Sequence, residues 1–145
     1  MSISHNFGVA LEVWSVKRNA KLNFRQQEEN HIMENIIYNE LLTRGYNVDV
    51  GIVETFSKVA GKSVRKNLEV DFVCNQASKR YYIQSAFEIS AQEKFQQEEN
   101  SLRRIDDAFK KIIVVKDTIK PWYNDRGVLI VGLTDFLLDP SFMDL

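Results

Sequence analysis

The sequence predicts an α/β sandwich around a mixed sheet, in the order helix, three antiparallel strands, helix, two strands and helix. Three observations carry this prediction: alternating segments in the middle of the chain, two unbroken apolar runs nearer the C-terminus, and segments with helical apolar spacing around them. The 145 residues suit one domain. We predict residues 1–24 as an N-terminal linker and residues 25–145 as that domain.

The first predicted helix spans residues 25–44, and Gly45 supplies its C-terminal stop. Its apolar side chains recur at three- and four-residue spacing, namely Met33, Ile36, Ile37, Leu41 and Leu42. Glu34 borders this stripe. If the Glu34 carboxylate is buried, it requires a cationic or hydrogen-bonding partner. If it lies at the edge of the stripe, it reaches water. Both interpretations stay open.

Three strands are predicted next, at residues 46–53, 68–73 and 81–87, because apolar and polar residues alternate there. The polar residues 75–79 are predicted to close the second and third strands into a hairpin.

Alternation assigns each side chain of this hairpin to a face of the sheet. Leu68, Val70 and Phe72 are predicted to share one face, with Asp71 on the other. The hairpin would then place Asp71 and Gln84 side by side, and this pair is the strongest sign of chemistry in the chain.

Residues 54–67 are predicted as a polar connection between the first two strands. Gly61-Lys62-Ser63 mimics the end of a phosphate-binding loop, but Phe56 stands where that loop needs glycine, so we predict no nucleotide site in this chain. Four cations make the segment the best local candidate for phosphate contact, with a solvated loop as the alternative. They are Lys58, Lys62, Arg65 and Lys66.

The remaining elements follow the hairpin. Ser90-Ala91-Gln92-Glu93 forms a capping box that opens a helix predicted to run to about Phe109. The apolar runs 112–115 and 128–131 predict strands covered on both faces. Thr134 is predicted to cap a short last helix.

Composition excludes several classes of protein. The formal charge of −1 gives no overall attraction to nucleic acid, so any basic surface must be local. The single Cys74 allows no internal disulfide and is predicted to be a small buried thiol rather than a nucleophile. Without a secretory signal or an apolar run long enough to span a bilayer, the expected location is the cytoplasm.

The order of these elements and the residues at their centre resemble the restriction-endonuclease-like, or PD-(D/E)XK, nuclease superfamily. The chain looks most like the C-terminal domain of bacterial and archaeal AAA-type ATP-binding proteins, whose function is uncharacterised. The resemblance covers residues 25–138, and the ATPase that normally precedes such a domain is not in this sequence. It rests on four segments: residues 34–42, 44–48, 69–73 and 82–84.

The resemblance implies a role for each matching residue. Glu34 matches the helix glutamate of the superfamily, and Asp71 matches its metal-binding aspartate. The Glu-x-Lys motif is replaced by Gln84-Ser85-Ala86, so a metal-binding carboxylate and a catalytic lysine are missing. Glu69 or Glu88 would have to rebuild the acidic cluster, and Lys79 or Lys94 would have to supply the lysine.

Three functions are compatible with this pattern. The first is a degenerate nuclease-fold domain that binds DNA or a partner protein and is normally joined to an AAA-type ATPase. The second is an active Mg²⁺- or Mn²⁺-dependent DNA endonuclease with Glu34, Asp71 and Gln84 as its site. The third is a structural or oligomerisation module, since fold does not fix function. The oligomeric state stays open.

Overall fold

The computed structural model describes the backbone of residues 3–86 and 92–144, and the side chains of residues 20–22, 24–86 and 95–144. The chain divides into two compact units, residues 1–32 and 33–145. Helix α1 (Ile3–Thr43) begins in the first unit and ends in the second. Most of the segment predicted as a linker is therefore helical, because it contains no proline to stop a helix.

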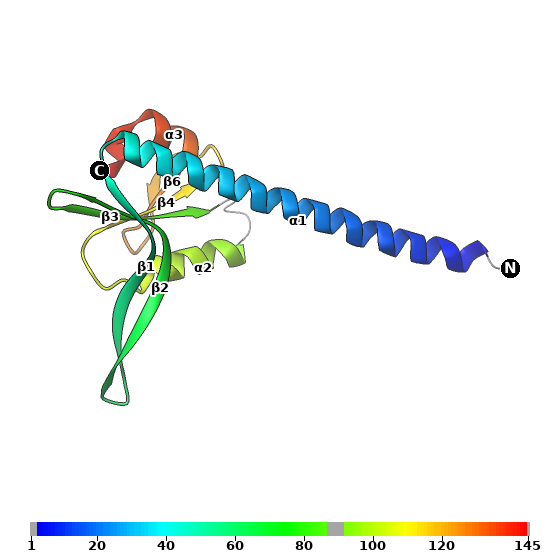
Figure 1. Ribbon diagram of the computed structural model, residues 1–145, viewed down its shortest axis with the longest axis horizontal. Helices are drawn as coiled ribbons and strands as arrows, with labels where there is room; N and C mark the ends of the chain where they lie inside the picture. The colour runs from blue at the N-terminus through cyan, green and yellow to red at the C-terminus, as the bar shows by residue number, and fades with distance from the viewer. Residues whose placement is uncertain (1–2, 87–91, 145) are drawn as a thin grey trace. The chain divides into compact units, whose positions relative to one another are not determined.

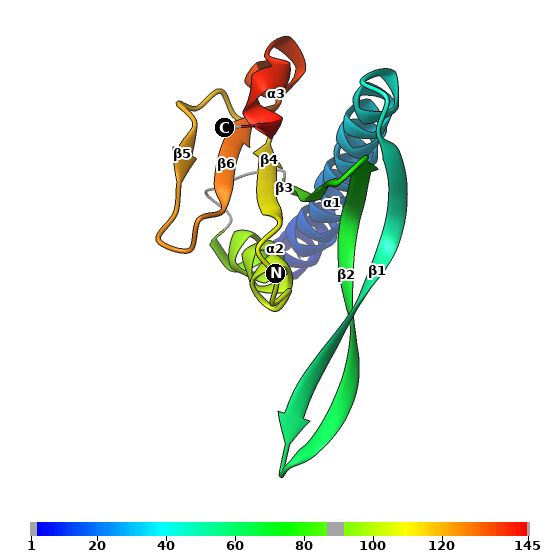
Figure 2. The same cartoon turned by 90° about the vertical axis from the view of Figure 1, so that its left-hand side faces the viewer.

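The second unit contains a six-stranded sheet in the order β1-β2-β3-β4-β6-β5 (Figure 2). The first three strands are antiparallel, β3, β4 and β6 are parallel, and β5 is antiparallel to β6. This confirms the predicted mixed sheet and adds one short strand to it. The strands are β1 (Asn47–Val59), β2 (Lys62–Gln76), β3 (Lys79–Ala86), β4 (Lys110–Val115), β5 (Trp122–Tyr123) and β6 (Leu129–Gly132).

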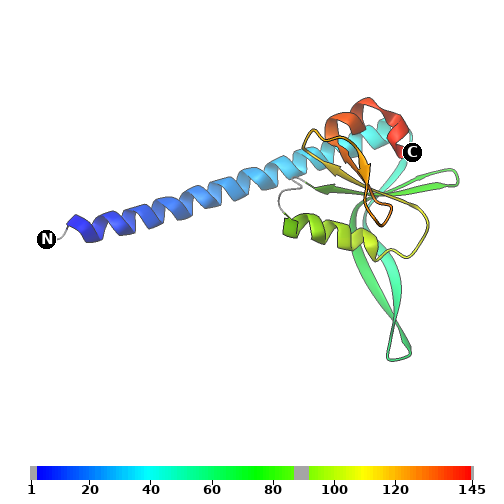
Figure 3. The same ribbon diagram turned by 180° about the vertical axis from the view of Figure 1, so that it is seen from behind.

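Helices cover both faces of this sheet. The end of α1, the short helix α3 (Leu133–Leu138) and the 3-10 turn η1 (Pro140–Met143) pack on one face, and α2 (Gln92–Arg103) packs on the other (Figure 3). Strand β4 shows the two layers, because Ile112 and Val114 belong to one core and Ile113 and Val115 to the other. The apolar runs are thus covered on both faces, as predicted.

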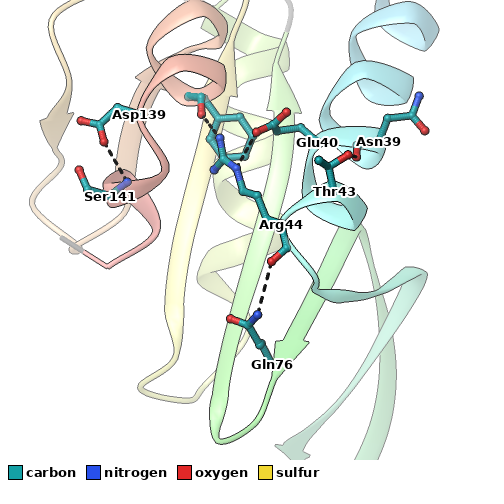
Figure 4. A network of polar contacts seen from close by, with 8 residues as sticks. Asn39, Glu40, Thr43, Arg44, Gln76, Asp139 and Ser141 are labelled. Atoms are coloured by element: carbon teal, nitrogen blue, oxygen red, sulfur yellow. Dashed lines mark hydrogen bonds and ion pairs between the residues drawn. The ribbon is translucent and has the colours of Figure 1, made fainter.

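The end of α1 is held by its backbone and by one part-buried arginine. Gly45 has φ +85° and donates to the Leu42 carbonyl, and Tyr46 donates to the Leu41 carbonyl, which together close the helix in a Schellman motif. Arg44 bonds Glu40 at 2.7 Å and the Phe136 carbonyl at 2.5 Å (Figure 4). These bonds tie α1 to α3.

The segment predicted as a polar loop, residues 54–67, is instead the far half of a long two-stranded ribbon. The β1–β2 pairing continues to Val59 and Lys62, and a two-residue turn of Ala60 and Gly61 with positive φ closes it. Figure 1 shows the ribbon reaching beyond the other strands of the sheet. The prediction was wrong because backbone pairing continues through polar residues when the two strands stay in register.

Two further features of the helices differ from the sequence prediction. Helix α2 ends at Arg103, and in the segment that leads to β4 the Asp107 carboxylate accepts the Phe109 N–H. Phe109 therefore lies outside the helix, and it is 41% exposed. Thr134 does not cap α3, whose N-cap is Gly132 and has no side-chain cap bond. The capping box begins at residues 90–91, which lie outside the described residues.

Candidate functional site

A β-bulge in β2 shapes the neighbourhood of Asp71. Asp49 pairs with Val73 and Gly51 pairs with Val70, so two residues of β2, Asp71 and Phe72, lie opposite one residue of β1. Gly51 beside the bulge has φ +135°, which L-residues rarely adopt.

The bulge changes which faces the β2 side chains occupy. Leu68 and Val70 pack in the core under α2, whereas Phe72 packs in the core under α1 and α3. The predicted common face for these three residues was therefore wrong at Phe72, because one extra residue reverses the alternation. Glu69 stays exposed between Leu68 and Val70.

The Asp71 carboxylate is bound to the neighbouring strand β3. Its Oδ2 accepts the Ser85 backbone N–H at 2.7 Å and the Ser85 hydroxyl at 2.7 Å. Its Oδ1 accepts from Gln84 Nε2 at 3.3 Å. The β2–β3 pairing ends at Phe72 and Ile83, so the Asp71 side chain bonds a backbone N–H just beyond the end of this pairing.

The Gln84 amide connects Asp71 to helix α2. Its Oε1 accepts the Asp71 backbone N–H at 3.1 Å, and its Nε2 donates to both the Asp71 carboxylate and Glu98 Oε2. Gln84 is only 6% exposed, so these bonds satisfy an amide that would be costly to bury alone. The structure thus brings Asp71 and Gln84 together and adds Glu98, which sequence patterns did not single out.

Burial dominates the electrostatics of Asp71. Desolvation raises the pKa of its carboxyl above the usual value of 3.8, while the two hydrogen bonds from Ser85 lower it. The protonated form is therefore easier to reach than in an exposed aspartate. The Gln84 N–H provides a dipole, not a charge, between the two carboxylates.

These polar atoms do not fit a divalent cation in the arrangement observed. Mg²⁺ and Mn²⁺ need oxygen ligands, but the Gln84 atom facing both carboxylates is a nitrogen that can only donate. Gln84 Oε1, the side-chain oxygen that could bind a cation, instead accepts the Asp71 backbone N–H. Among the side chains that the structure describes, no three or more His, Cys, Asp or Glu residues are grouped to hold a metal.

The other predicted site residues have different settings, and two of them lie outside the described side chains. Glu34 is half-buried on α1 beside Met33, which packs in the core on the face opposite α2. Lys79 pairs with Asp144 at 2.7 Å and lies five residues along β3 from Gln84, a separation of about 17 Å. The side chains of Glu88 and Lys94 are not among those described.

Cys74 is a buried free thiol, as predicted. Burial, reinforced by the nearby Asp49 carboxylate, raises the pKa of Cys74 to about 12. The thiolate that would act as a nucleophile is therefore strongly disfavoured.

The four cations predicted for phosphate contact all lie exposed on the ribbon, in different settings. Arg65 forms an ion pair with Glu54 across the ribbon, and Lys58 and Lys62 lie near its turn. Lys66 lines a groove of about 750 Å³ between the ribbon and the turn after α2.

This groove contains cations on both sides. Arg80 and Arg104 line it opposite the ribbon, and the exposed ring of Phe56 lies on the ribbon side. Asp106 and Asp49 also line it, so its charge is mixed. A sequence pattern could not assemble this groove, because its walls come from separate parts of the chain.

Comparisons with known proteins give one informative match. No family model matches the chain. An uncharacterised protein of Haemophilus influenzae is 33% identical over 106 residues, which cover 73% of this chain and 22% of that protein. The chain therefore spans about a fifth of the length of this relative. Among the described residues, no helix has the length and apolar character to cross a membrane.

Proposed function

We propose that this chain is a degenerate nuclease-fold domain that binds DNA and does not cleave it through a divalent metal. The observation that carries the proposal is the Gln84 amide, which donates to the carboxylates of Asp71 and Glu98 at the point where a nuclease of this type needs a cation. An aspartate on the second strand of the sheet, bonded to the residue that replaces the glutamate of the third strand, is the arrangement that the resemblance implies.

The chemistry of the neighbouring positions supports the loss of cleavage. A metal-dependent nuclease uses a lysine or a similar cation to position and activate the attacking water. Ala86, at the lysine position, is 6% exposed and packs with the apolar side chains under α2. A methyl group there supplies neither charge nor a proton.

The ribbon supports the DNA-binding part of the proposal. Its β2 edge presents Lys62 and Lys66, and two-stranded ribbons are among the elements that enter DNA grooves. Because phosphate contacts by lysine and arginine need no particular base, such a surface gives affinity with little sequence preference.

The wider context also belongs to the proposal. The relative from Haemophilus influenzae is several times longer than the matching segment, which leaves room in it for another domain. We propose that an AAA-type ATPase is the partner of this domain, in the same chain or another, and that both act in the cytoplasm.

Fluorescence anisotropy with labelled duplex, branched and single-stranded DNA tests the binding. The double variant Lys62→Ala, Lys66→Ala should bind more weakly, and its salt dependence should fall by about 0.9 logarithmic units for each phosphate that the removed lysines neutralise. Lys120→Ala, an exposed lysine away from the ribbon, is the matched control. Absence of binding at low salt would reject DNA as the ligand and favour a partner protein.

A cleavage assay tests the loss of activity. The wild type and Asp71→Ala should be equally inactive on the same DNA substrates with Mg²⁺ or Mn²⁺. Metal-dependent cleavage by the wild type that Asp71→Ala abolishes would show instead that the domain is an active endonuclease.

A further inference from the structure

Strand β1 is the edge of the described sheet, because it pairs with β2 alone. The strand is long and presents large apolar side chains to solvent, with Ile52 64% and Phe56 70% exposed. An edge of this kind offers unpaired backbone N–H and C=O groups to another strand. Proteins usually protect such edges with charged side chains, so the distribution of charge along the ribbon is informative.

The two edges of the ribbon differ in charge. The β2 edge contains Lys62, Arg65 and Lys66 within five positions, so a second copy of the same strand would be repelled. The β1 edge between residues 53 and 59 contains one anion, Glu54, and one cation, Lys58, with Phe56 midway between them. This spacing is self-complementary for an antiparallel pair.

We propose that β1 pairs with β1 of a second copy of this chain about a two-fold axis at Phe56. In this register Glu54 lies opposite the partner's Lys58, and Lys58 lies opposite the partner's Glu54. Phe56 faces the partner's Phe56, and Val53 faces the partner's Val59. Each of these is a favourable cross-strand pair, and a two-fold interface must be self-complementary in this way.

Charge selects this register over its neighbours. Shifting the pairing by one or two residues removes the direct contact of Glu54 with Lys58 and places at least one charge opposite an uncharged side chain. The Arg65 ion pair within the ribbon remains compatible, because the exposed Glu54 carboxylate has two oxygens. The basic β2 edges stay on the outer sides of the paired ribbons, so this inference does not depend on DNA binding.

Charge reversal gives the first test, with the full chain in sedimentation velocity over a range of concentrations. Glu54→Lys and Lys58→Glu should each weaken dimerisation roughly tenfold, because each creates two like-charge pairs. The double variant Glu54→Lys, Lys58→Glu should restore dimerisation, because it recreates opposite charges in the same register. A chain that is monomeric at every concentration, or a double variant no better than the single ones, would overturn the proposal.

Cysteine cross-linking gives a second test that reports the register directly. In Phe56→Cys the two introduced thiols would lie on strands whose paired Cα atoms are about 4.5–5.5 Å apart, within disulfide range. In Ile52→Cys, at a similarly exposed position, the thiols would be about 27 Å apart. Mild oxidation should give a covalent dimer with Phe56→Cys only. Equal cross-linking of both variants, or of neither, would reject the register.

Discussion

Replacement of Gln84 by glutamate tests the chemistry of the polar network most sharply. The change keeps the size of the side chain but removes the N–H donors that face Asp71 and Glu98. Three carboxylates would then share one largely buried site. We expect the variant to be much less stable than the wild type at neutral pH.

The geometry sets the magnitude of this effect. Gln84 Nε2 lies 3.3 Å from Asp71 Oδ1, and two unit charges at this distance repel by about 5 kcal/mol at an effective dielectric constant of about 20. Proton uptake by the cluster limits the penalty, so the free energy of unfolding should fall by about 3–5 kcal/mol. Gln84→Met, which removes the same hydrogen bonds without adding charge, should lose only about 1–3 kcal/mol.

Urea denaturation followed by circular dichroism provides the measurement, at neutral and mildly acidic pH, with EDTA or with Mn²⁺. Stability of Gln84→Glu should recover in acid, where the carboxylates bind protons, and also with Mn²⁺, which oxygen ligands favour. Gln84→Met should respond to neither. If the two variants lose equal stability under every condition, the amide does not separate two carboxylates and the reasoning fails.

Three further changes test other parts of the structure by the same measurement. Burial raises the pKa of Asp71, so protonation of Asp71 stabilises the folded state below the unfolded pKa, and this stabilisation is lost as pH rises through the folded pKa. Asp71→Asn should lack this pH-dependent loss of stability. An identical pH profile for the wild type and Asp71→Asn would contradict this expectation. Leu102→Ala should cost about 2–5 kcal/mol because Leu102, on α2, is fully buried in the core between this helix and the sheet. Leu138→Ala, at a residue that is 78% exposed, should cost less than about 0.5 kcal/mol. Gly45→Ala should cost about 1–2 kcal/mol because φ is +85°, and an unchanged midpoint would show that the helix end relaxes.

Local patterns in the sequence determine much of the secondary structure. Alternation locates the β2–β3 hairpin, and the runs at 112–115 and 128–131 locate β4 and β6, because each pattern reflects burial on one or two faces of a sheet. Gly45 marks the end of α1 because few other residues adopt positive φ at low cost. The neighbourhood of Asp71 and Gln84 also follows from the hairpin alone, since it spans few residues.

Tertiary structure decides what these residues can do. The bulge at Asp71 turns Phe72 into the opposite core, and α2 brings Glu98 to the Gln84 amide. Both depend on hydrogen bonds between segments distant in the sequence, which period-two or helical spacing does not encode. The sequence pattern also did not predict the length of the β1–β2 ribbon, because backbone hydrogen bonds continue the pairing where the side chains are polar. The sequence by itself therefore determines the order of the helices and strands. Hydrogen bonds between segments distant in the sequence determine which face of the sheet each side chain occupies, and they form the groove and the polar network.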